Sequence, residues 1–576
     1  MERQLRCTVL WVPAFEGVVD AVPVYNIVIN NIAILAMGKA SKKSGTPDDQ
    51  QFKLFVELPA GGKLGRTAAE SGRRFITGDP RAIVIGTIPL EQYLRESGQT
   101  SVFTVARLLD EQNWSEFEGC YAPTGRPPFS PRQMMGLILY GVMQGVHSLR
   151  ELERLARLDL GCMWITGGIA PDFTKIGRFI TRHASSLTSS FFESLTAQIL
   201  KAAGSKSARL AGDGTVIEAA CSHYHLLREE AIRERAAAAQ AALSARPDDP
   251  QVQREHQISE QCVKVFEERA LARKRSGRSK ETLSVSPTEP DAMVQPLKRK
   301  RGMSASYKPS ILANEDRIIT AMAIDASSET KPVATLLDQS ERVVGSKPEE
   351  VLFDAGYFDD GVIATTLERD ISLLCPEGQV PGELKQGKVF PKAQFEFDQS
   401  TDSYRCPAGQ TLIFMKAFEA TTTKPARRQY GTSACCQCAA RAECTSQQRR
   451  FILRNANDET RDVLRQVMRQ PQVRAVFAQR KTMVEPVFSH LRGKQGFNRF
   501  RRSGLRAAAS EFALHALAYN LSRAVALLGA DFGLISAFMY LFQAFKLLKI
   551  RLSEIFCRVV RIDRASVGIV PTGLPV

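Results

Sequence analysis

The stretch LAGDGT, residues 210–215, is the most informative part of this chain, because an apolar run leads there to Asp213 between two glycines. A second stretch, VLFDAGY at residues 351–357, has the same design and ends its apolar run at Asp354. Short apolar runs that end at a glycine are typical of buried strands. The pattern therefore predicts two strands, each with an aspartate at its exposed end.

A third acidic residue stands in the stretch VEPVF, residues 484–488, where Glu485 precedes a proline. The residues around it have helical character. Because Pro486 cannot donate a backbone hydrogen bond, we expect the helix to kink or restart at this point. A glutamate at a helix start is electrostatically favourable. The sequence thus predicts one acid on a helix in addition to the two on strands.

Two aspartates and a glutamate suit divalent cations, which prefer oxygen ligands and usually take one or two carboxylates each. A pair of such ions can activate the attacking oxygen and stabilise the leaving oxygen of a displacement at phosphorus. We therefore predict that Asp213, Asp354 and Glu485 hold two Mg²⁺ (or Mn²⁺) ions and are the catalytic residues. Solvated surface charge is the alternative, since the chain has 61 acidic residues. Asp359 and Asp360 are rival ligands, but their position after a turn suits helix caps better.

In order and context, these three acidic segments resemble the signature of bacterial insertion-sequence DDE transposases. The resemblance is greatest to the group with an InsH-type helical N-terminal domain and a cysteine-containing insert before the catalytic Glu. It extends from about Leu90 to about Leu528. It includes Gly125-Arg126-Pro127-Pro128, Pro171-Asp172-Phe173, Ser304 to Ser310 and Tyr404-Arg405-Cys406-Pro407.

The resemblance implies an α/β fold with a ribonuclease-H-like catalytic core, in which helices flank a mixed sheet, together with an all-helical N-terminal domain and a small Cys-rich insert. It implies a DNA transposase that binds the terminal inverted repeats of its element, cleaves there, and joins the released 3′ hydroxyl to target DNA. Pairing of two DNA ends implies a homodimer or a higher oligomer. Two alternatives are a metal-dependent nuclease of the same fold without strand transfer and a catalytically dead DNA-binding relic.

Composition agrees with a DNA-binding enzyme of several domains. The chain has 576 residues, 44% of them hydrophobic, and its 77 basic residues exceed the 61 acidic ones, giving a net charge of +16 and a pI near 9.4. Such an excess favours a polyanionic partner. We find no signal-peptide pattern, and the apolar run 533–545 is shorter than the roughly 20 residues that span a bilayer. We therefore expect no membrane partner and a place in the bacterial cytoplasm, associated with the nucleoid.

Changes in composition along the chain, together with this resemblance, imply eight segments. They are an N-terminal extension of unknown role (1–88), a helical DNA-binding domain (89–204), the first part of the catalytic core (205–226), a helical and flexible insertion (227–303), the continued core (304–374), a Cys-rich insert (375–450), the C-terminal part of the core (451–530) and a C-terminal helical tail (531–576). Within the insertion we expect one or two helices over 228–275. The Ser-, Thr- and Pro-rich link 276–296 is expected to lack fixed structure.

The helical domain contains a candidate helix-turn-helix. Capping boxes at 130–133 and 148–151 predict two helix starts on either side of a short turn. The second helix would present Arg150 and Arg154 to DNA, although an ordinary helical hairpin with a solvated charged face fits as well. A third long helix is expected from about Thr174 to Ala203.

Cations alternate with aromatic rings after the catalytic Glu, a combination that binds phosphates while rings stack on bases. The predicted DNA-binding residues in this part of the chain are Arg492, Lys494, Arg499, Arg501 and Arg502. A solvated basic turn is the alternative. For Tyr357, stacking on DNA and packing in the core remain equally open.

Five of the twelve cysteines cluster in the insert. Without a secretion signal, they are expected to be either reduced thiols or metal ligands. Tetrahedral zinc takes four such ligands, and the candidates are Cys406, Cys435, Cys438 and Cys444. Because only Cys406 precedes the long gap in the spacing, a structural Zn²⁺ and free thiols remain alternatives.

Overall fold

The computed structural model describes residues 66–68, 74–222, 225–275, 277, 279–296, 302–378, 390–420, 426–445, 447–455 and 457–529. All of them belong to one compact unit, Leu58–Val576. The predicted C-terminal tail at 531–576 and most of the predicted N-terminal extension lie outside these residues. Within the described part, no helix combines the length and the apolar character needed to cross a bilayer.

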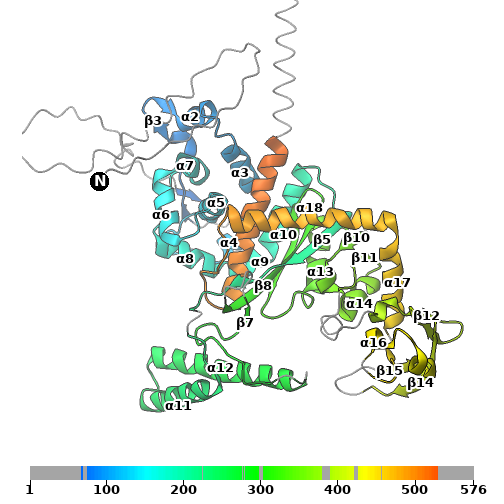
Figure 1. The fold of residues 1–576 in the computed structure, drawn as a ribbon. Helices are drawn as coiled ribbons and strands as arrows, with labels where there is room; N and C mark the ends of the chain where they lie inside the picture. The colour runs from blue at the N-terminus through cyan, green and yellow to red at the C-terminus, as the bar shows by residue number, and fades with distance from the viewer. Residues whose placement is uncertain are drawn as a thin grey trace, which may run out of the picture. The chain divides into compact units, whose positions relative to one another are not determined.

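The N-terminal part is helical (Figure 1). Its elements are β1 (Arg66–Ala68), β2 (Arg74–Ile76), η1 (Pro80–Ala82), β3 (Val84–Ile85), β4 (Ile88–Pro89), α2 (Leu90–Glu96), α3 (Ser101–Asp110), α4 (Ser115–Gly119), α5 (Pro131–Met143), α6 (Leu149–Leu158), α7 (Leu160–Thr166), α8 (Phe173–Arg182), α9 (Ala184–Thr188) and α10 (Ser190–Ala202). Residues 74–89 pack onto these helices, because Phe75 is buried and Gln133 exchanges hydrogen bonds with the backbone of Gly78.

Two expectations for this domain are wrong. The helix predicted from Thr174 to Ala203 is three helices, α8, α9 and α10, which are interrupted at His183 and Ser189. The helix starts at Pro131 and Leu149 are as expected, but the side chains of Ser130 and Ser148 form no capping hydrogen bond. Burial of nearly the whole of α5 stabilises that helix instead, since all but one of its residues are buried.

A mixed sheet follows the helical domain. Its strands are β5 (Arg209–Gly214), β6 (Ile217–Glu218), β7 (Met293–Pro296), β8 (Met303–Asn314), β9 (Ile319–Asp325), β10 (Glu350–Leu352) and β11 (Ser372–Leu374). The central order is β9-β8-β5-β10-β11, with β8 antiparallel to both of its neighbours and β10 parallel to β5 and β11. This is the order of the ribonuclease-H-like fold, and it confirms the predicted fold class.

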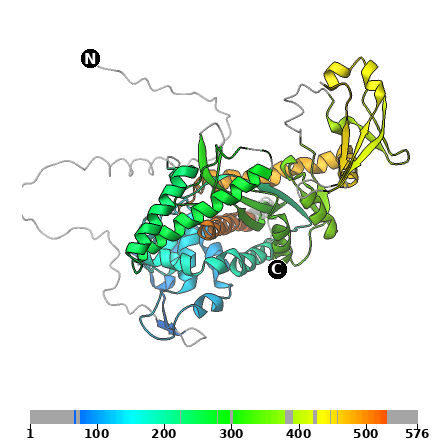
Figure 2. The same ribbon diagram turned by 90° about the horizontal axis from the view of Figure 1, so that it is seen from below.

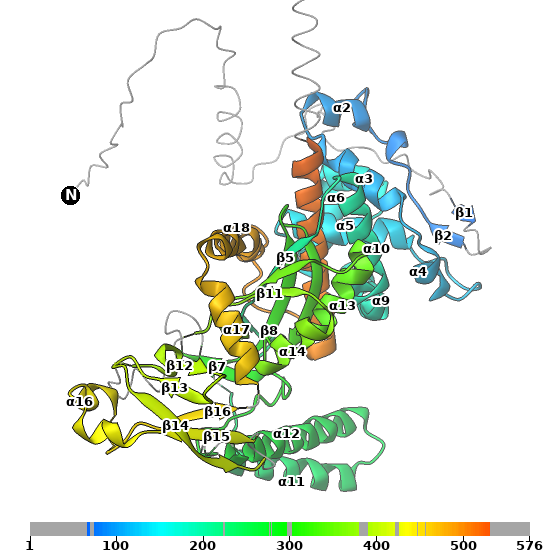
Figure 3. The ribbon, with the colours of Figure 1, turned by 90° about the vertical axis from the view of Figure 1, so that its right-hand side faces the viewer.

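Helices cover both faces of this sheet (Figure 3). On one side, α13 (Val333–Val344) and α14 (Asp360–Glu368) share a core with Leu210 and Val351. On the other, α18 (Pro471–Gly493) and the helix at 505–529 share a core with Ala211 and Leu352, the alternate residues of the same strands. The helix at 505–529 thus closes this face of the core.

The helical domain is joined to the sheet through buried and exposed polar contacts. Asn520 Nδ2 donates to the carbonyl of Ile319 on β9 and to Thr196 Oγ1 on α10. Arg342 of α13 forms an ion pair with Glu193 of α10, with Nη2 and Oε1 2.7 Å apart. Because these contacts and one continuous apolar core link the two parts, the helical domain gives the catalytic sheet a fixed support.

The insertion between β6 and β7 is an antiparallel pair of helices, α11 (Glu229–Ala245) and α12 (Pro250–Arg275), which lie side by side in Figure 2. This matches the expectation of one or two helices. The expectation of an unstructured link at 276–296 is wrong for its described residues. Val285 exchanges backbone hydrogen bonds with Leu227, and Glu289 accepts from Tyr307 and from the backbone N–H of Gly504. These long-range contacts outweigh the local Ser, Thr and Pro composition.

The Cys-rich insert forms a second, antiparallel sheet. Its elements are η4 (Lys392–Gln394), β12 (Glu396–Asp398), β13 (Ser403–Arg405), β14 (Thr411–Phe418), β15 (Arg427–Gly431), η5 (Ser433–Gln437), α16 (Arg441–Cys444) and β16 (Ile452–Asn455). The strands pair in sequence order. Because β16 pairs with β15, this sheet extends beyond the boundary predicted at residue 450.

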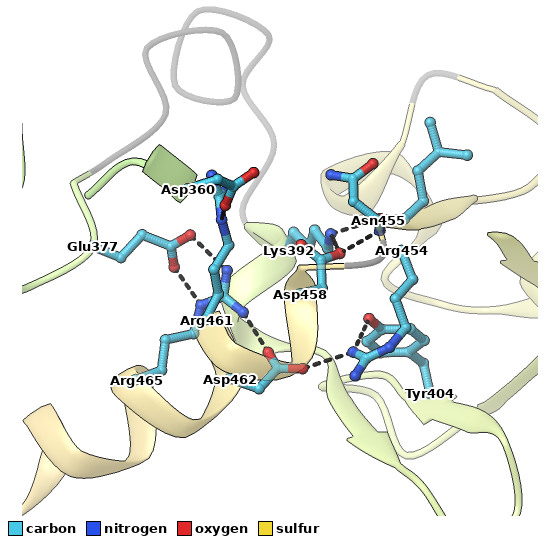
Figure 4. Close-up of polar contacts among 11 residues, drawn as sticks. Asp360, Glu377, Lys392, Tyr404, Arg454, Asn455, Asp458, Arg461, Asp462 and Arg465 are labelled. Atoms are coloured by element: carbon cyan, nitrogen blue, oxygen red, sulfur yellow. Dashed lines mark hydrogen bonds and ion pairs between the residues drawn. The ribbon is translucent and has the colours of Figure 1, made fainter. Parts of the chain in front are cut away.

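Helix α17 (Asp458–Arg469) connects the insert to the catalytic part (Figure 4). On the catalytic side, Arg461 Nε lies 2.6 Å from Asp360 Oδ1, and Arg465 donates two hydrogen bonds to Glu377. On the insert side, Arg454 Nη1 lies 2.7 Å from Asp462 Oδ2. One short helix thus holds both modules through charged contacts.

Candidate active site

Asp213 lies near the end of β5, as predicted, and its carboxylate accepts a hydrogen bond from the backbone N–H of Gly214 at 2.9 Å. The strand passes close to its neighbour here. A Cβ at Gly212 would lie 2.0 Å from the Phe353 ring, so only glycine fits this position. The close contact fixes the Asp213 strand against the strand that leads to Asp354.

Asp354 follows the end of β10 and caps the short helix η3 (Ala355–Tyr357), where its Oδ1 accepts from the Gly356 N–H at 2.8 Å. The preceding Phe353 is fully buried and stacks on Tyr357, with ring centroids 4.5 Å apart. Tyr357 is itself fully buried. Core packing is therefore the role of Tyr357, and a DNA contact is excluded.

Arg480 of α18 brings the two aspartates together. Its Nη2 lies 3.1 Å from Asp213 Oδ1 and 3.6 Å from Asp354 Oδ2. The exposed side-chain fractions are 9% for Arg480, 21% for Asp213 and 46% for Asp354. A largely buried cation thus lies between the carboxylates and reduces their mutual repulsion.

Opposing influences act on the pKa of Asp213. Burial has the largest effect and raises this pKa, and the negative charges of Asp354 and Glu329 act in the same direction. The Arg480 guanidinium and the Gly214 N–H oppose the rise. The net result is a pKa above the ordinary value, because burial disfavours the charged carboxylate.

Glu485 lies on α18, as expected, but its position within the helix differs from the prediction. The helix begins at Pro471 and continues through Pro486 to Gly493, so Glu485 is not at a helix start and no restart occurs. Burial of Val484, Val487 and Phe488 on both sides of the proline holds the helix together. The Glu485 side chain is exposed and forms no ion pair within the described residues.

The described residues contain no group of three or more His, Cys, Asp or Glu side chains arranged to hold a metal ion. Asp213 and Asp354 nevertheless suit a divalent metal ion as a pair. Both offer hard carboxylate oxygens, and both already face the same cationic nitrogen.

Glu329, which the sequence did not indicate, is a third acid beside Asp213. A Cβ at Gly214 would lie 2.6 Å from Glu329 Cγ, so the side chain lies directly against the Asp213 strand. Its Oε1 is 3.6 Å from Lys308 Nζ. No local motif surrounds Glu329, so only the fold could have indicated it.

The rival ligands Asp359 and Asp360 have other roles. Asp359 caps α14 and accepts from the Gly361 N–H, while Asp360 pairs with Arg461. Their predicted preference for a helix start is confirmed.

Three of the predicted DNA-binding arginines make contacts within the protein. Arg492 donates to Thr215 Oγ1 and to the Val216 carbonyl, and Arg499 donates to the carbonyls of Ala219 and Cys221. Burial lowers the pKa of Arg502, and the nearby carboxylate of Glu511 opposes that change. The contacts of Arg492 and Arg499 hold the segment after α18 against the first strands of the core.

The side chains of Arg150, Arg154, Lys494 and Arg501 are exposed. The turn between α5 and α6 lies against the segment after α18, since a Cβ at Gly145 would meet the Lys494 carbonyl at 2.9 Å. A cavity of about 310 Å³ is lined by His147 and Ser148 from that turn and by Arg501 and Arg502. The structure thus brings the two predicted DNA-binding segments together.

The four candidate zinc ligands line one small cavity of about 30 Å³ in the insert, but within the described residues they do not form a group arranged to hold a metal ion. Cys406 occupies a tight turn in which its Sγ accepts from the Gln410 N–H at 3.3 Å. The pKa of Cys444 is raised, first by burial and also by the neighbouring Cys435, Cys406 and Cys438. Cys436 is exposed and lies apart, with its Sγ 3.9 Å from the Gln448 carbonyl.

Two family models match the chain. Residues 405–525 match a transposase DDE domain, and residues 90–182 match a transposase domain (DUF772). A sheet of ribonuclease-H-like order with acidic residues at its edge, together with these matches, defines a DDE transposase. The chain carries a transposase DDE domain and a DUF772 transposase domain, and the predicted resemblance to insertion-sequence DDE transposases is confirmed at this level. A transposase DDE domain implies dependence on divalent metal ions and binding to DNA.

Among solved structures, the cryo-EM synaptic complex of the piggyBac transposase with hairpin DNA is similar at 9% sequence identity and a TM-score of 0.28. The similarity covers 75% of this chain and 72% of that one. No curated protein matches the chain.

Proposed function

We propose that the protein binds the terminal inverted repeats of its own element, cleaves the DNA there and joins the released 3′ hydroxyl to target DNA. The observation that carries this proposal is the contact of one buried arginine, Arg480, with the carboxylates of Asp213 and Asp354. Such an arrangement keeps two acids close together at the edge of a rigid sheet. It prepares them to receive divalent cations and a phosphodiester.

Asp213, Asp354 and Glu485 are the proposed ligands of two Mg²⁺ or Mn²⁺ ions. When bound, such ions polarise the scissile phosphate and stabilise the attacking and leaving oxygens. Glu485 lies on the exposed side of α18 and forms no ion pair within the described residues, so its carboxylate is not engaged by another charged side chain. Arg480 positions the carboxylates and offsets their negative charge before metal and DNA bind.

DNA contacts are proposed for the exposed cations Arg150, Arg154, Lys494 and Arg501. Because the α5–α6 turn packs against the segment after α18, one stretch of duplex can contact both. Arg492, Arg499 and Arg502 support this surface through their contacts with the first core strands and Glu511. We place the reaction in the bacterial cytoplasm, on the nucleoid, with at least two chains pairing the two DNA ends.

A structural Zn²⁺ is proposed for Cys406, Cys435, Cys438 and Cys444. Thiolates are preferred zinc ligands, and four of them complete a tetrahedral site. The cavity they share and the N–H···S contact at Cys406 support this proposal, and zinc binding would bring the four sulfurs closer together than they lie in the structure. Zinc would stabilise the insert and would take no part in the chemistry.

The test is magnesium-dependent nicking and joining of labelled DNA from the flanks of the gene, with the intact chain and with Asp213→Asn. We expect nicked and joined products that disappear in the variant. Products without joining would show a nuclease of the same fold. Salt-sensitive binding without any product would show a DNA-binding relic. Products that survive the substitution would show that the acids are misassigned.

A further inference from the structure

The helical domain has a cavity of about 420 Å³ that the proposed active site does not use. It forms where the segment 121–129 meets helix α8. Two motifs singled out in the sequence, Gly125-Arg126-Pro127-Pro128 and Pro171-Asp172-Phe173, belong to that segment and to the start of α8. The volume lies within the range of pockets that take small organic ligands.

Four cations line this cavity, namely Arg126, Lys175, Arg178 and Arg182, and its lining contains no carboxylate among the described residues. The three from α8 share one face of the helix because of their spacing. Lys175 is partly neutralised by Asp172, whose Oδ2 lies 2.8 Å from its Nζ. Arg126 and Arg178 have no ion-pair partner in the part of the chain that the structure describes. The cavity therefore has an unbalanced positive charge that favours an anionic group.

Aromatic and apolar side chains form the rest of the wall, including Tyr121, Phe129 and Phe179. Arg182 Cζ lies 4.6 Å from the centre of the Tyr121 ring, and Lys175 Nζ lies 5.5 Å from that of Phe129. The Tyr121 hydroxyl is 3.1 Å from His183 Nε2, which fixes the ring. Flat rings beside cations are the combination that holds a base and its phosphate.

We propose that this cavity binds a single unpaired nucleotide, with the phosphate at Arg126 and Arg178 and the base against Tyr121 and Phe129. The shared chemistry is that of a nucleoside phosphate. Its source is either an unpaired nucleotide of the DNA substrate or a free nucleoside monophosphate. The first source rests on the proposed function, because it requires that the protein binds DNA.

The test measures fluorescence anisotropy of three labelled duplexes with the full chain and without divalent metal, so that no cleavage occurs. One duplex is fully paired, one has a single unpaired thymidine, and one has an abasic site in place of that thymidine. We expect the intact chain to bind the duplex with the unpaired thymidine about tenfold more tightly than the other two. Arg178→Gln should remove this preference and leave affinity for the paired duplex within about threefold, because one phosphate contact is lost.

Arg107→Gln is the matched control, since Arg107 is an exposed arginine of the same domain outside the cavity, and it should keep the preference. Saturable binding of thymidine monophosphate that Arg178→Gln abolishes, without any preference among the duplexes, would assign the cavity to a free nucleotide. Equal affinity for all three duplexes together with no binding of the monophosphate would overturn the proposal. Failure to bind even the paired duplex would instead contradict the proposed function.

Discussion

The catalytic sheet and the Cys-rich sheet of the same chain are built differently. In the catalytic sheet, alternate strand residues enter separate cores, so that Leu210 packs on one face and Ala211 on the other. The core of the Cys-rich sheet contains five buried residues within its described part. On β14, Ile413 remains 60% exposed and Met415 45% exposed. The first sheet can hold carboxylates rigidly by packing alone, whereas the second needs support from other interactions.

Cation–ring contacts provide part of that support. Arg454 Cζ lies 3.6 Å from the centre of the Phe397 ring, and Arg428 Cζ lies 4.5 Å from that of Phe414. Each such contact contributes about 0.5–1 kcal/mol at an exposed site. Small cores of this kind are commonly completed by a metal or a disulfide. The comparison explains why four thiols gather in the insert and acidic residues gather at the catalytic sheet.

The largest expected effect is on catalysis. Asp354→Asn should lower the rate of DNA nicking by about 10³-fold, because losing a metal ligand removes several kcal/mol of transition-state stabilisation. Asp359→Asn is the matched control and should keep the rate, since asparagine caps a helix as well as aspartate does. An equal loss in the two variants would reject Asp354 as the specific ligand.

In the Cys-rich sheet, the expected effect is on metal content. Elemental analysis of the intact chain should find about one zinc per chain, and Cys438→Ser should reduce it to below about 0.2 by removing one of four ligands. Limited proteolysis should then cut the insert first. Cys436→Ser should change neither result, because that thiol lies apart from the cavity. Zinc-free protein with a protease-resistant insert would show that the sheet needs no metal.

Packing in the catalytic sheet can be tested at Gly212. Gly212→Ala places a methyl group in the Phe353 ring and should lower the free energy of unfolding by about 1–3 kcal/mol, the typical cost of overpacking. Urea denaturation measures this change. Gly493→Ala is the control, since nothing lies within 4 Å of a Cβ there, and its unfolding midpoint should not fall.

A smaller effect, on the free energy of unfolding, is expected where helix α17 joins the two sheets. The Arg461–Asp360 ion pair is partly exposed, so its coupling free energy should be about 0.5 kcal/mol. A double-mutant cycle of Arg461→Gln and Asp360→Asn measures it. A coupling near zero would mean that other contacts hold α17 to the catalytic part.

The smallest expected effect is a shift in the pH dependence of the nicking rate. A protonated carboxyl cannot bind a cation, and burial raises the pKa of Asp213, so nicking should fall in acid at a higher pH than an ordinary aspartate would give. Arg480→Gln removes the cation that opposes this rise. The acidic limb of its pH–rate profile should therefore move to still higher pH. Movement to lower pH would contradict the assigned influence of Arg480.

The sequence allowed the aspartates to be predicted because each follows a local apolar run that ends at a strand. It did not indicate Arg480 or Glu329, since their partners at Asp213 and Gly214 are brought near only by the fold. Pro486 suggested a helix break because a local rule cannot include the burial on both sides that keeps α18 continuous. The prediction of an unstructured link at 276–296 was wrong for the same reason. The backbone N–H of Gly504, far along the chain, donates a hydrogen bond to Glu289.

The most direct test of the catalytic centre compares Glu485→Gln with Glu329→Gln in the magnesium-dependent nicking assay. Glu485 is the proposed third ligand although it is exposed and unpaired within the described residues, whereas Glu329 lies against the Asp213 strand and pairs with Lys308. We predict that Glu485→Gln abolishes nicking and that Glu329→Gln retains most of it. Loss of nicking in Glu329→Gln with activity preserved in Glu485→Gln would contradict the account and assign the third position to the acid beside β5.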